Sequence, residues 1–405
     1  MTDRVLAIIL AGGTGRRLEP LTRHRAKPAV PFGGKYRIID FTLANCLHSG
    51  LRQVLVLTQY KSHSLQKHLR DGWGIYNAEL GEYITLVPPQ MRTGADWYAG
   101  TADAIHQNRF LLERSAADLV LILSGDHIYR MDYAAMIRRH REREAELTLA
   151  SMEVPIGEAS AFGVMSVDDA MRVQRLEEKP AEPAALPDDP SRARVSMGIY
   201  CFDKHLLVEA LERDHADPDS THDFGKDVVP RLIREHRVFS YGFGGPGGRV
   251  SRDRYWRDVG TLDAYYEANM ALLDPVPPLD LYQPDWTIRT YQAQHPPART
   301  VPGASGSEGV FINSIVAGGS IIAGGGVHHS ILFPRVRVND GAIVEDAILF
   351  EGVEVGAHAQ VHHCIVDKGV RIPANEQVGV DPARDRERFH VSASGVVVVP
   401  RDVRF

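Results

Sequence analysis

The chain has 405 residues, of which 44% are hydrophobic and 24% charged, and its formal net charge is −6. This composition is typical of a globular protein and excludes a mainly disordered or fibrous chain. The acidic balance argues against nucleic acid or an anionic membrane surface as a partner. The one early apolar run, at 5–10, is too short for a signal sequence or a membrane span, so we expect a cytoplasmic protein with no membrane partner.

Residues 1–272 alternate β-rich runs with segments of helical period, which is typical of an α/β fold whose mixed sheet is covered on both faces. We predict a Rossmann-like domain there. A proline-rich stretch at 273–302 predicts an extended connector to a second domain at 303–405. The expected strands are 5–10, 53–58, 119–123, 147–152 and 197–202, and the expected helices include 102–114 and 133–146.

A glycine-rich turn follows the first expected strand, and its glycines are Gly12, Gly13 and Gly15. Such a turn lets backbone N–H groups approach phosphate oxygens, although its spacing is neither GxGxxG nor that of a Walker A loop. Residues 14–37 hold seven basic side chains against one acid. Arg17 and Lys27, two fixed cations beside the turn, suit a triphosphate whose charge grows in the transition state.

Two aspartates are the candidate metal ligands. Asp126 follows the apolar run 119–123, and a residue directly after a parallel strand lies at the sheet edge where open α/β sheets bind ligands. Asp258 lies in the segment Tyr-Trp-Arg-Asp-Val-Gly-Thr at 255–261. Each alone is as consistent with a turn. Together they predict a Mg²⁺ site facing nucleotide phosphates.

The period changes after the connector, where aliphatic residues recur every six positions between glycine-rich corners. A hexapeptide period is typical of a β-helix, in which these side chains stack inward. The sequence therefore predicts a C-terminal parallel β-helix. The residues expected in its core are Ile315, Ile321, Val327, Phe333, Ile343, Leu349, Val355, Val361, Val366, Ile372 and Val378.

The chain resembles the bacterial ADP-glucose pyrophosphorylases (glucose-1-phosphate adenylyltransferases) over nearly its whole length. The resemblance implies transfer of the adenylyl group of ATP to glucose 1-phosphate for glycogen synthesis, a left-handed form of the β-helix, a homotetramer, and allosteric control by anionic metabolites. The motifs that carry it lie at 11–18, 25–35, 97–104, 125–129, 161–165, 178–180, 196–200, 223–227 and 256–261.

The resemblance also implies roles for individual residues. Arg17 and Lys27 would hold the ATP phosphates beside the glycine-rich turn, and Asp126 with Asp258 would hold Mg²⁺. The catalytic set would then be Arg17, Lys27 and Asp126. The residues implied around glucose 1-phosphate are Tyr98, Gly163, Glu178, Lys179 and Ser196.

The resemblance bears on regulation at one position, and the basic residues beside the connector suggest two more. Several relatives have lysine at the position of His24, where it is tied to activation by a sugar phosphate, so the identity of the effector stays open. We expect Arg25 and Arg335, on either side of the connector, to share an anionic effector. Two histidine pairs on the predicted β-helix are expected at corners or on the surface rather than in acetyl transfer, and these are His328 with His329 and His362 with His363.

Other functions stay open from the sequence. One is a pyrophosphorylase for a UDP-, dTDP- or GDP-sugar, or an acetyltransferase–uridylyltransferase fusion, because pocket geometry selects the base. Another is a catalytically inactive regulatory subunit on the same fold. Such a subunit is expected to lack part of the charged set, whereas Arg17, Lys27, Asp126 and Asp258 are all present.

Overall fold

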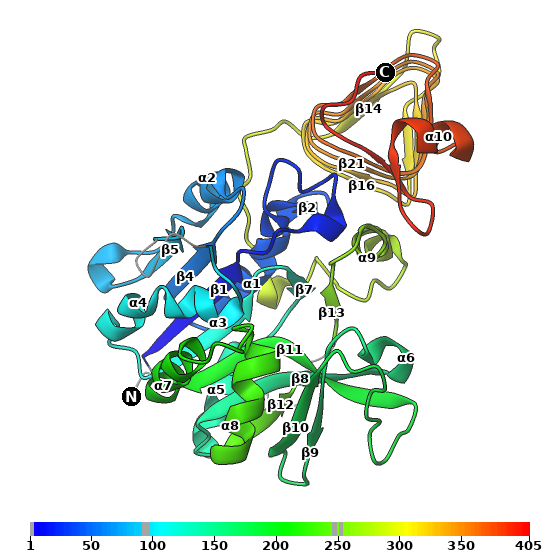
Figure 1. The fold of residues 1–405 in the computed structure, drawn as a ribbon. Helices are drawn as coiled ribbons and strands as arrows, with labels where there is room; N and C mark the ends of the chain where they lie inside the picture. The colour runs from blue at the N-terminus through cyan, green and yellow to red at the C-terminus, as the bar shows by residue number, and fades with distance from the viewer. Residues whose placement is uncertain (1–3, 91–96, 245–248, 251–253) are drawn as a thin grey trace.

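A computed structural model describes residues 4–90, 97–244, 249–250 and 254–405. An N-terminal α/β domain, blue to green in Figure 1, carries a C-terminal stack of β coils, yellow to red. The predicted architecture is confirmed. None of the helices in the described part of the chain has the length and apolar content needed to cross a bilayer.

The α/β domain is built on a nine-stranded mixed sheet. Its parallel centre comprises β1 (Val5–Ala11), flanked by β4 (Gln53–Thr58) and β6 (Leu119–Ser124). β5 (Tyr83–Val87) extends it in parallel beyond β4, and β11 (Arg192–Asp203) runs antiparallel to β6. The remaining strands are β8 (Leu147–Pro155), β9 (Gly163–Val167), β10 (Val173–Glu178) and β12 (Val238–Gly242).

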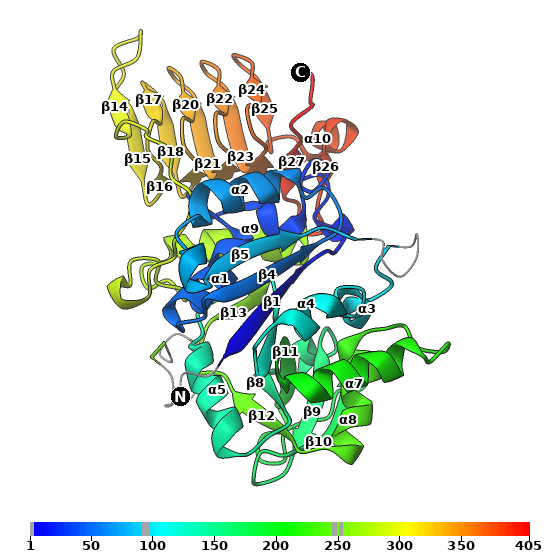
Figure 2. The ribbon, with the colours of Figure 1, turned by 90° about the vertical axis from the view of Figure 1, so that its left-hand side faces the viewer.

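Helices cover both faces of this sheet, so alternate residues of its central strands enter different cores. On β1, Ala7 and Ile9 pack in the core that includes α1 and α2, whereas Leu6 and Ile8 pack in the core beneath α3, α7 and α8 (Figure 2). The helices are α1 (Ile38–His48), α2 (His63–Trp73), α3 (Thr101–His106), α4 (Arg109–Arg114), α5 (Tyr133–Glu142), α6 (Ile156–Ala159), α7 (Lys204–His215), α8 (Val229–Glu235), α9 (Leu262–Met270) and α10 (Pro382–Arg388).

One continuous helix was expected at 102–114. This expectation was wrong, because the segment forms two helices, α3 and α4. Asn108 leaves the helical conformation, with φ −109° and ψ 15°. Its side-chain amide donates to the carbonyl of Ala104 at 2.8 Å and to the Tyr98 hydroxyl at 2.9 Å. An asparagine that bonds back to the preceding turn competes with the helical hydrogen bonds, which explains the break.

The C-terminal coils form the predicted parallel β-helix, seen from its side in Figure 2. In one wall Val327, Val344, Val361 and Val378 stack in register, so each coil has 17 residues. One sheet contains β14 (Arg299–Val301), β17 (Ile321–Ala323), β20 (Arg337–Val338), β22 (Glu354–Val355) and β24 (Arg371–Ile372). The other contains β15 (Val310–Ile312), β16 (Ile315–Val316), β18 (Gly326–His328), β19 (Ile331–Leu332), β21 (Ile343–Leu349), β23 (Gln360–Val366), β25 (Gln377–Val378), β26 (His390–Val391) and β27 (Val397–Val399).

The phase of the β-helix core was predicted correctly at seven of the eleven positions. These seven residues are Val327, Leu349, Val355, Val361, Val366, Ile372 and Val378. At two others the inward position is the next residue in the chain, because Ile322 and Val344 are buried where Ile321 and Ile343 were expected. The other two, Ile315 and Phe333, pack against the α/β domain instead.

One wall of the β-helix shares a core with the α/β domain. Ile331, Phe333, Ile348, Phe350 and Ile365 point out of the coils into the apolar core of α1 and α9. Strands turn alternate side chains to opposite faces, so a single wall fills the coil interior with one set and the domain interface with the other. The β-helix is therefore packed against the α/β domain as part of one structure.

The proline-rich connector is also fixed in place. Trp286 is buried, and its indole N–H donates to Oδ1 of Asn45 on α1 at 2.9 Å. Leu279 is fully buried in the α/β core, and the first β-helix strand begins at Arg299, inside the stretch expected to be connector. The connector is therefore packed against the α/β domain.

Candidate active site

The glycine-rich turn leaves the carboxyl end of β1 at the centre of the sheet. Gly15 has φ +65° and precedes a 3₁₀ turn at Arg16–Leu18. A Cβ placed on Gly15 would lie 3.1 Å from Cγ2 of Thr22 and 3.3 Å from Cβ of Lys27. Glycine at this position therefore allows both the left-handed turn and the close packing of Lys27 beneath it. Gly13 faces open space, and Gly12 packs on Gln59.

Lys27 lies between the two predicted metal ligands. Its ammonium donates to Oδ2 of Asp126 at 2.8 Å and to Oδ1 of Asp258 at 2.9 Å. Asp126 follows β6, and Asp258 ends β13 (Trp256–Asp258), which pairs antiparallel with β7 (His127–Tyr129). The structure thus brings three predicted site residues from distant parts of the chain into direct contact.

The charges in this cluster hold one another ionised. Burial alone would lower the pKa of Lys27, but the carboxylates of Asp126 and Asp258 outweigh it and raise that pKa above its usual value. Burial alone would raise the pKa of Asp126, yet Lys27 and His127 hold it well below its usual range. Burial lowers the pKa of His127, so its ring is neutral beside the charged groups at neutral pH.

Arg17 lies at the exposed side of this cluster. A Cβ placed on Gly260 would lie 3.1 Å from Nη2 of Arg17 and 2.9 Å from Oδ2 of Asp258. The guanidinium therefore reaches the segment that follows β13. Because Arg17 is exposed while Lys27 is buried, one cation is free to reach an incoming polyanion and the other is fixed beneath it.

Four of the five residues expected around the sugar phosphate adjoin one another. Gly163 and Glu178 are register partners on β9 and β10, and Ser196 lies on β11. A Cβ on Gly163 would lie 2.9 Å from Oε2 of Glu178 and 3.7 Å from Cβ of Ser196. The exposed Lys179 ammonium lies 3.2 Å from Oε1 of Glu178. A carboxylate and an ammonium on adjacent residues present an acceptor and a cation on one side of the sheet.

Ring contacts connect this group with the carboxylate cluster. His127 packs edge-on against Trp256 with a centroid separation of 4.8 Å, and Trp256 packs against Phe162 at 5.3 Å. Phe162 immediately precedes Gly163. The two groups of predicted residues therefore belong to one continuous region at the carboxyl ends of the central strands.

Tyr98 lies on a segment that approaches the glycine-rich turn. In the orientation that satisfies its amide, Gln59 donates to the carbonyl of Gly12 at 3.1 Å and accepts from the Tyr98 N–H at 3.0 Å. The Tyr98 hydroxyl accepts from Asn108. The backbone of Tyr98 is thus held beside the turn, while its hydroxyl bonds within its own segment.

The two arginines expected to share an effector have different surroundings. Arg25 is buried, and its Nη2 lies 2.7 and 3.0 Å from the two carboxylate oxygens of Asp367 in the β-helix. Arg335 is exposed and donates to Oε1 of Glu351 at 2.9 Å, and Oε2 of Glu351 accepts from Lys368. Arg25 joins the two domains, whereas Arg335 and Lys368 lie at the surface of that joint.

The histidine pairs lie at equivalent positions two coils apart. His329 and His363 have φ values of 42° and 41°, which places them at corners. Nδ1 of His329 lies 2.5 Å from Oδ1 of Asp346, and Nδ1 of His363 lies 3.2 Å from the hydroxyl of Tyr266 on α9. The first member of each pair lies in a strand of the β-helix. His328 is the last residue of β18, and His362 lies within β23.

Three contributors to the site were not singled out from the sequence, namely Gln59, Ser124 and His127. Ser124 donates to Asp126, and His127 lies within reach of both carboxylates. Gln59 comes directly after β4, and the other two come at or just after the end of β6. The rule that ligands bind beyond the carboxyl ends of parallel strands would have marked all three.

Comparisons with known proteins agree with this geometry. Residues 6–275 match the nucleotidyl transferase family, and residues 296–399 match the GlmU-like, C-terminal hexapeptide family. The chain is 61% identical over 400 residues to glucose-1-phosphate adenylyltransferase 2 of Vibrio cholerae, covering 99% of this chain and 98% of that relative. The chain belongs to the glucose-1-phosphate adenylyltransferase family.

Other members of the family are similar over the same extent. Glucose-1-phosphate adenylyltransferase 1 of Alkalilimnicola ehrlichii is 52% identical, with 100% of this chain and 95% of the relative covered. The glucose-1-phosphate adenylyltransferase of Methylococcus capsulatus is 48% identical, with 99% and 94% covered. The likeness spans both domains, so the chain is a nucleotidyltransferase with the two-domain organisation of this family.

Proposed function

We propose that this glucose-1-phosphate adenylyltransferase family member transfers the adenylyl group of ATP to glucose 1-phosphate and releases pyrophosphate. The observation that carries the proposal is the convergence of Lys27, Asp126 and Asp258 beside the glycine-rich turn. The names of the relatives supply the two substrates. An inactive regulatory subunit is disfavoured, because the charged set is complete and Lys27, Asp126 and Asp258 are in contact.

The chemistry requires positioning and charge neutralisation. A phosphate oxygen of glucose 1-phosphate attacks the α-phosphorus of ATP, the new P–O bond forms, and the bond to the β-phosphate oxygen breaks with pyrophosphate as the leaving group. The nucleophile is already an anion, so no general base has to remove a proton. Arg17 and Lys27 offset the repulsion between two polyanions and the charge that develops on the leaving group.

The residues present fit a divalent cation. The carboxylates of Asp126 and Asp258 converge on one ammonium, and two carboxylates against one ammonium leave one negative charge. Oxygen ligands of this kind are those that Mg²⁺ prefers. Asp126 and Asp258 would hold Mg²⁺, which when bound supplies further positive charge to the nucleotide phosphates.

The substrate assignment is tested by pyrophosphate release with glucose 1-phosphate and each of ATP, UTP, GTP, CTP and dTTP. We expect ATP to give the highest kcat/KM and the reaction to require Mg²⁺. A second series with ATP and other sugar 1-phosphates tests the acceptor. The adenylyl assignment fails if UTP or dTTP exceeds ATP by about tenfold, a difference of about 1.4 kcal/mol in the barrier.

We further propose that the ADP-glucose made by this enzyme is used for glycogen synthesis. We also propose that the enzyme is a homotetramer whose activity is controlled by an anionic metabolite. The support for an effector site lies in two basic side chains at the domain joint, the exposed Arg335 and the half-buried Lys368. An anion there would compete with Glu351 for both cations. Arg335→Ala is expected to weaken the response to sugar phosphates, whereas Arg337→Ala, on the neighbouring β20, is not. An unchanged response in Arg335→Ala would place the effector elsewhere.

A further inference from the structure

A second cluster of metal-binding side chains lies between α3 and α7, apart from the carboxylates that face Lys27. Asp103 and His106 are three residues apart on α3 and so share one side of that helix. His215 is the last residue of α7. One ligand atom from each of the three side chains lies within 4.8 Å of the other two.

His106 has an unsatisfied nitrogen in this cluster. The residue is only 5% exposed, and its Nδ1 has no hydrogen-bond partner among the residues that the structure describes. A buried polar atom without a partner costs free energy, so such an atom calls for a ligand.

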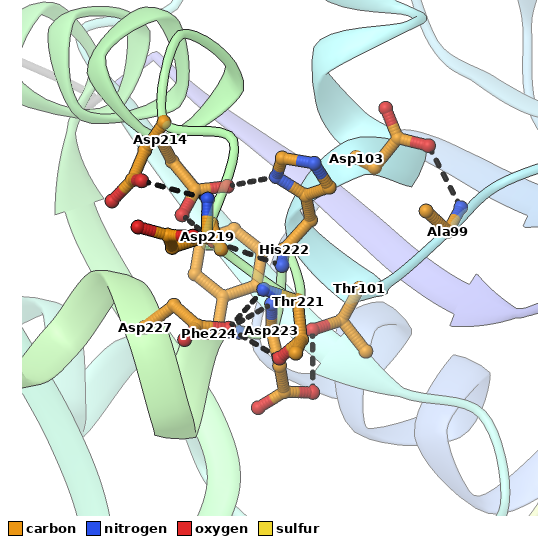
Figure 3. A network of polar contacts seen from close by, with 12 residues as sticks. Ala99, Thr101, Asp103, Asp214, Asp219, Thr221, His222, Asp223, Phe224 and Asp227 are labelled. Carbon is orange, nitrogen blue, oxygen red and sulfur yellow. Dashed lines mark hydrogen bonds and ion pairs between the residues drawn. The ribbon is translucent and has the colours of Figure 1, made fainter.

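Asp103 is already oriented by neighbouring donors. Its Oδ2 accepts from the backbone N–H of Ala99 at 2.8 Å, drawn in Figure 3, and from Nε2 of Gln107 at 2.9 Å. Hydrogen bonds of this kind orient the carboxylate ligands of metal sites. Both bonds go to one oxygen, which leaves the other oxygen of Asp103 for a cation.

His215 is the exposed member of the cluster. Its ring stacks on that of His106 with centroids 3.9 Å apart, and the residue is exposed at the helix end. Tetrahedral ligands at about 2.0–2.1 Å from a metal lie about 3.4 Å from one another. The two rings lie face to face with an interplanar angle of 19°, whereas the lone pairs of ring nitrogens lie in the ring planes. Binding one ion therefore requires the His215 side chain to rotate about its torsions as well as to approach, which its exposed position permits.

We propose that Asp103, His106 and His215 bind a divalent transition-metal ion of the zinc class, with water as a fourth ligand. Two imidazoles and one carboxylate are ligands that suit Zn²⁺ or Co²⁺, whereas Mg²⁺ prefers an all-oxygen site. The site differs in position and in ligand chemistry from Asp126 and Asp258.

The metal would join α3 to α7, and α3 also contacts the segment at 222–224 that follows α7 in the chain. Thr101, the first residue of α3, donates to Oδ2 of Asp223 at 3.1 Å and accepts from the N–H of Phe224 at 3.0 Å (Figure 3). His222, beside Asp223, accepts from the N–H of Ala102 through its carbonyl at 2.8 Å. An ion between α3 and α7 would therefore stabilise this junction without taking part in the reaction.

The test uses the full chain stripped of metal with a chelator and titrated with Co²⁺ and then Zn²⁺ in saturating Mg²⁺, which occupies the carboxylate pair. The variant is His215→Gln, at the exposed end of α7. The matched control is His205→Gln, at an exposed histidine in the first turn of the same helix. The readouts are Co²⁺ visible absorption and the rise in melting temperature with Zn²⁺.

Wild type and His205→Gln are expected to give the intense absorption of four-coordinate Co²⁺, which Zn²⁺ displaces, and to melt higher with Zn²⁺. His215→Gln is expected to bind Co²⁺ more than about 100-fold more weakly, since loss of a supporting partner alone costs about 10–100-fold. Its melting temperature without metal is expected to match wild type. Equal Co²⁺ binding by wild type and His215→Gln, or an equal loss in His205→Gln, would overturn the proposal.

Discussion

The ion pair between Arg25 and Asp367 joins residues 342 positions apart and allows a sharp test of how the two domains support each other. The side chains are 5% and 3% exposed. Two hydrogen bonds, at 2.7 and 3.0 Å, connect one guanidinium nitrogen to both carboxylate oxygens. Arg25→Ala removes the cation and leaves the Asp367 charge buried without its partner.

The expected loss of stability is large. Removing one member of a buried, hydrogen-bonded ion pair costs about 3–5 kcal/mol, because the remaining charge stays out of water without compensation. With a urea dependence of about 3 kcal/mol per molar, the unfolding midpoint falls by about 1–1.7 M. Arg23→Ala, at an exposed arginine two residues earlier, is the control and is expected to change stability by less than about 0.5 kcal/mol.

Urea unfolding measured with two probes separates the domains. All four tryptophans precede the β-helix, at 73, 97, 256 and 286, so fluorescence reports the α/β domain and its connector. Circular dichroism reports the whole chain. If the Arg25–Asp367 ion pair couples the stabilities of the two domains, Arg25→Ala is expected to lower the urea midpoints of both signals together. A two-domain chain need not unfold in one step, so the two probes are also compared in wild type.

A double-mutant cycle measures the interaction free energy between Arg25 and Asp367. Arg25→Met combined with Asp367→Asn removes both charges and keeps an acceptor for the N–H of Lys368, which bonds to Oδ1 of Asp367 at 2.7 Å. The double variant is expected to recover about 2 kcal/mol relative to the sum of the single changes. Additive effects, or an Arg25→Ala loss no larger than that of Arg23→Ala, would refute the reasoning.

Three further changes test the site and the joint. Asp126→Asn is expected to lower kcat by about 10²–10⁴-fold, because one of the two carboxylates facing Lys27 loses its charge; steady-state kinetics measure this. Lys179→Ala is expected to raise KM for glucose 1-phosphate with little change for ATP. Burial would raise the pKa of Glu351, but Lys368 and Arg335 hold it below its usual value, so Glu351→Gln is expected to lower the melting temperature at neutral pH, with the difference vanishing as the pH falls through that lowered pKa.

Each of these has a result that contradicts it. An Asp126→Asn enzyme with unchanged kcat and Mg²⁺ dependence would remove that carboxylate from the metal site. Equal KM increases for both substrates in Lys179→Ala, or the same increase in Lys67→Ala on α2, would show that the lysine does not select the sugar phosphate. A melting difference for Glu351→Gln that persists in acid, or that Glu354→Gln reproduces, would exclude the assigned ionisation.

Much of the local structure was predictable because it depends on neighbours in the chain. The strand expected at 53–58 has the same bounds as β4, and the strands expected at 5–10 and 119–123 each extend by one residue. Buried parallel strands are apolar on both faces, which makes them visible in a single sequence. The glycine-rich turn was also predictable, because the turn directly follows the end of its strand in the sequence. The hexapeptide period likewise identified the β-helix.

The structure had to decide which distant groups meet. Lys27 contacts carboxylates 99 and 231 residues away, and its own segment shows only a basic run. The break between α3 and α4 depends on where Asn108 finds hydrogen-bond acceptors. Phe333 matches the hexapeptide period but packs in the domain interface, because strand alternation assigns a side chain to a face and not to a partner.

The sequence by itself determined the strands, the glycine-rich turn and the repeat, since each follows from periodicity or chain contiguity over a few residues. Tertiary structure alone decided that Arg25 is buried against Asp367, that the connector lies fixed on α1, and that Asp103 and His106 meet His215. Contacts of this kind depend on the packing of whole elements, whose free energy is spread over many side chains and is absent from any short segment.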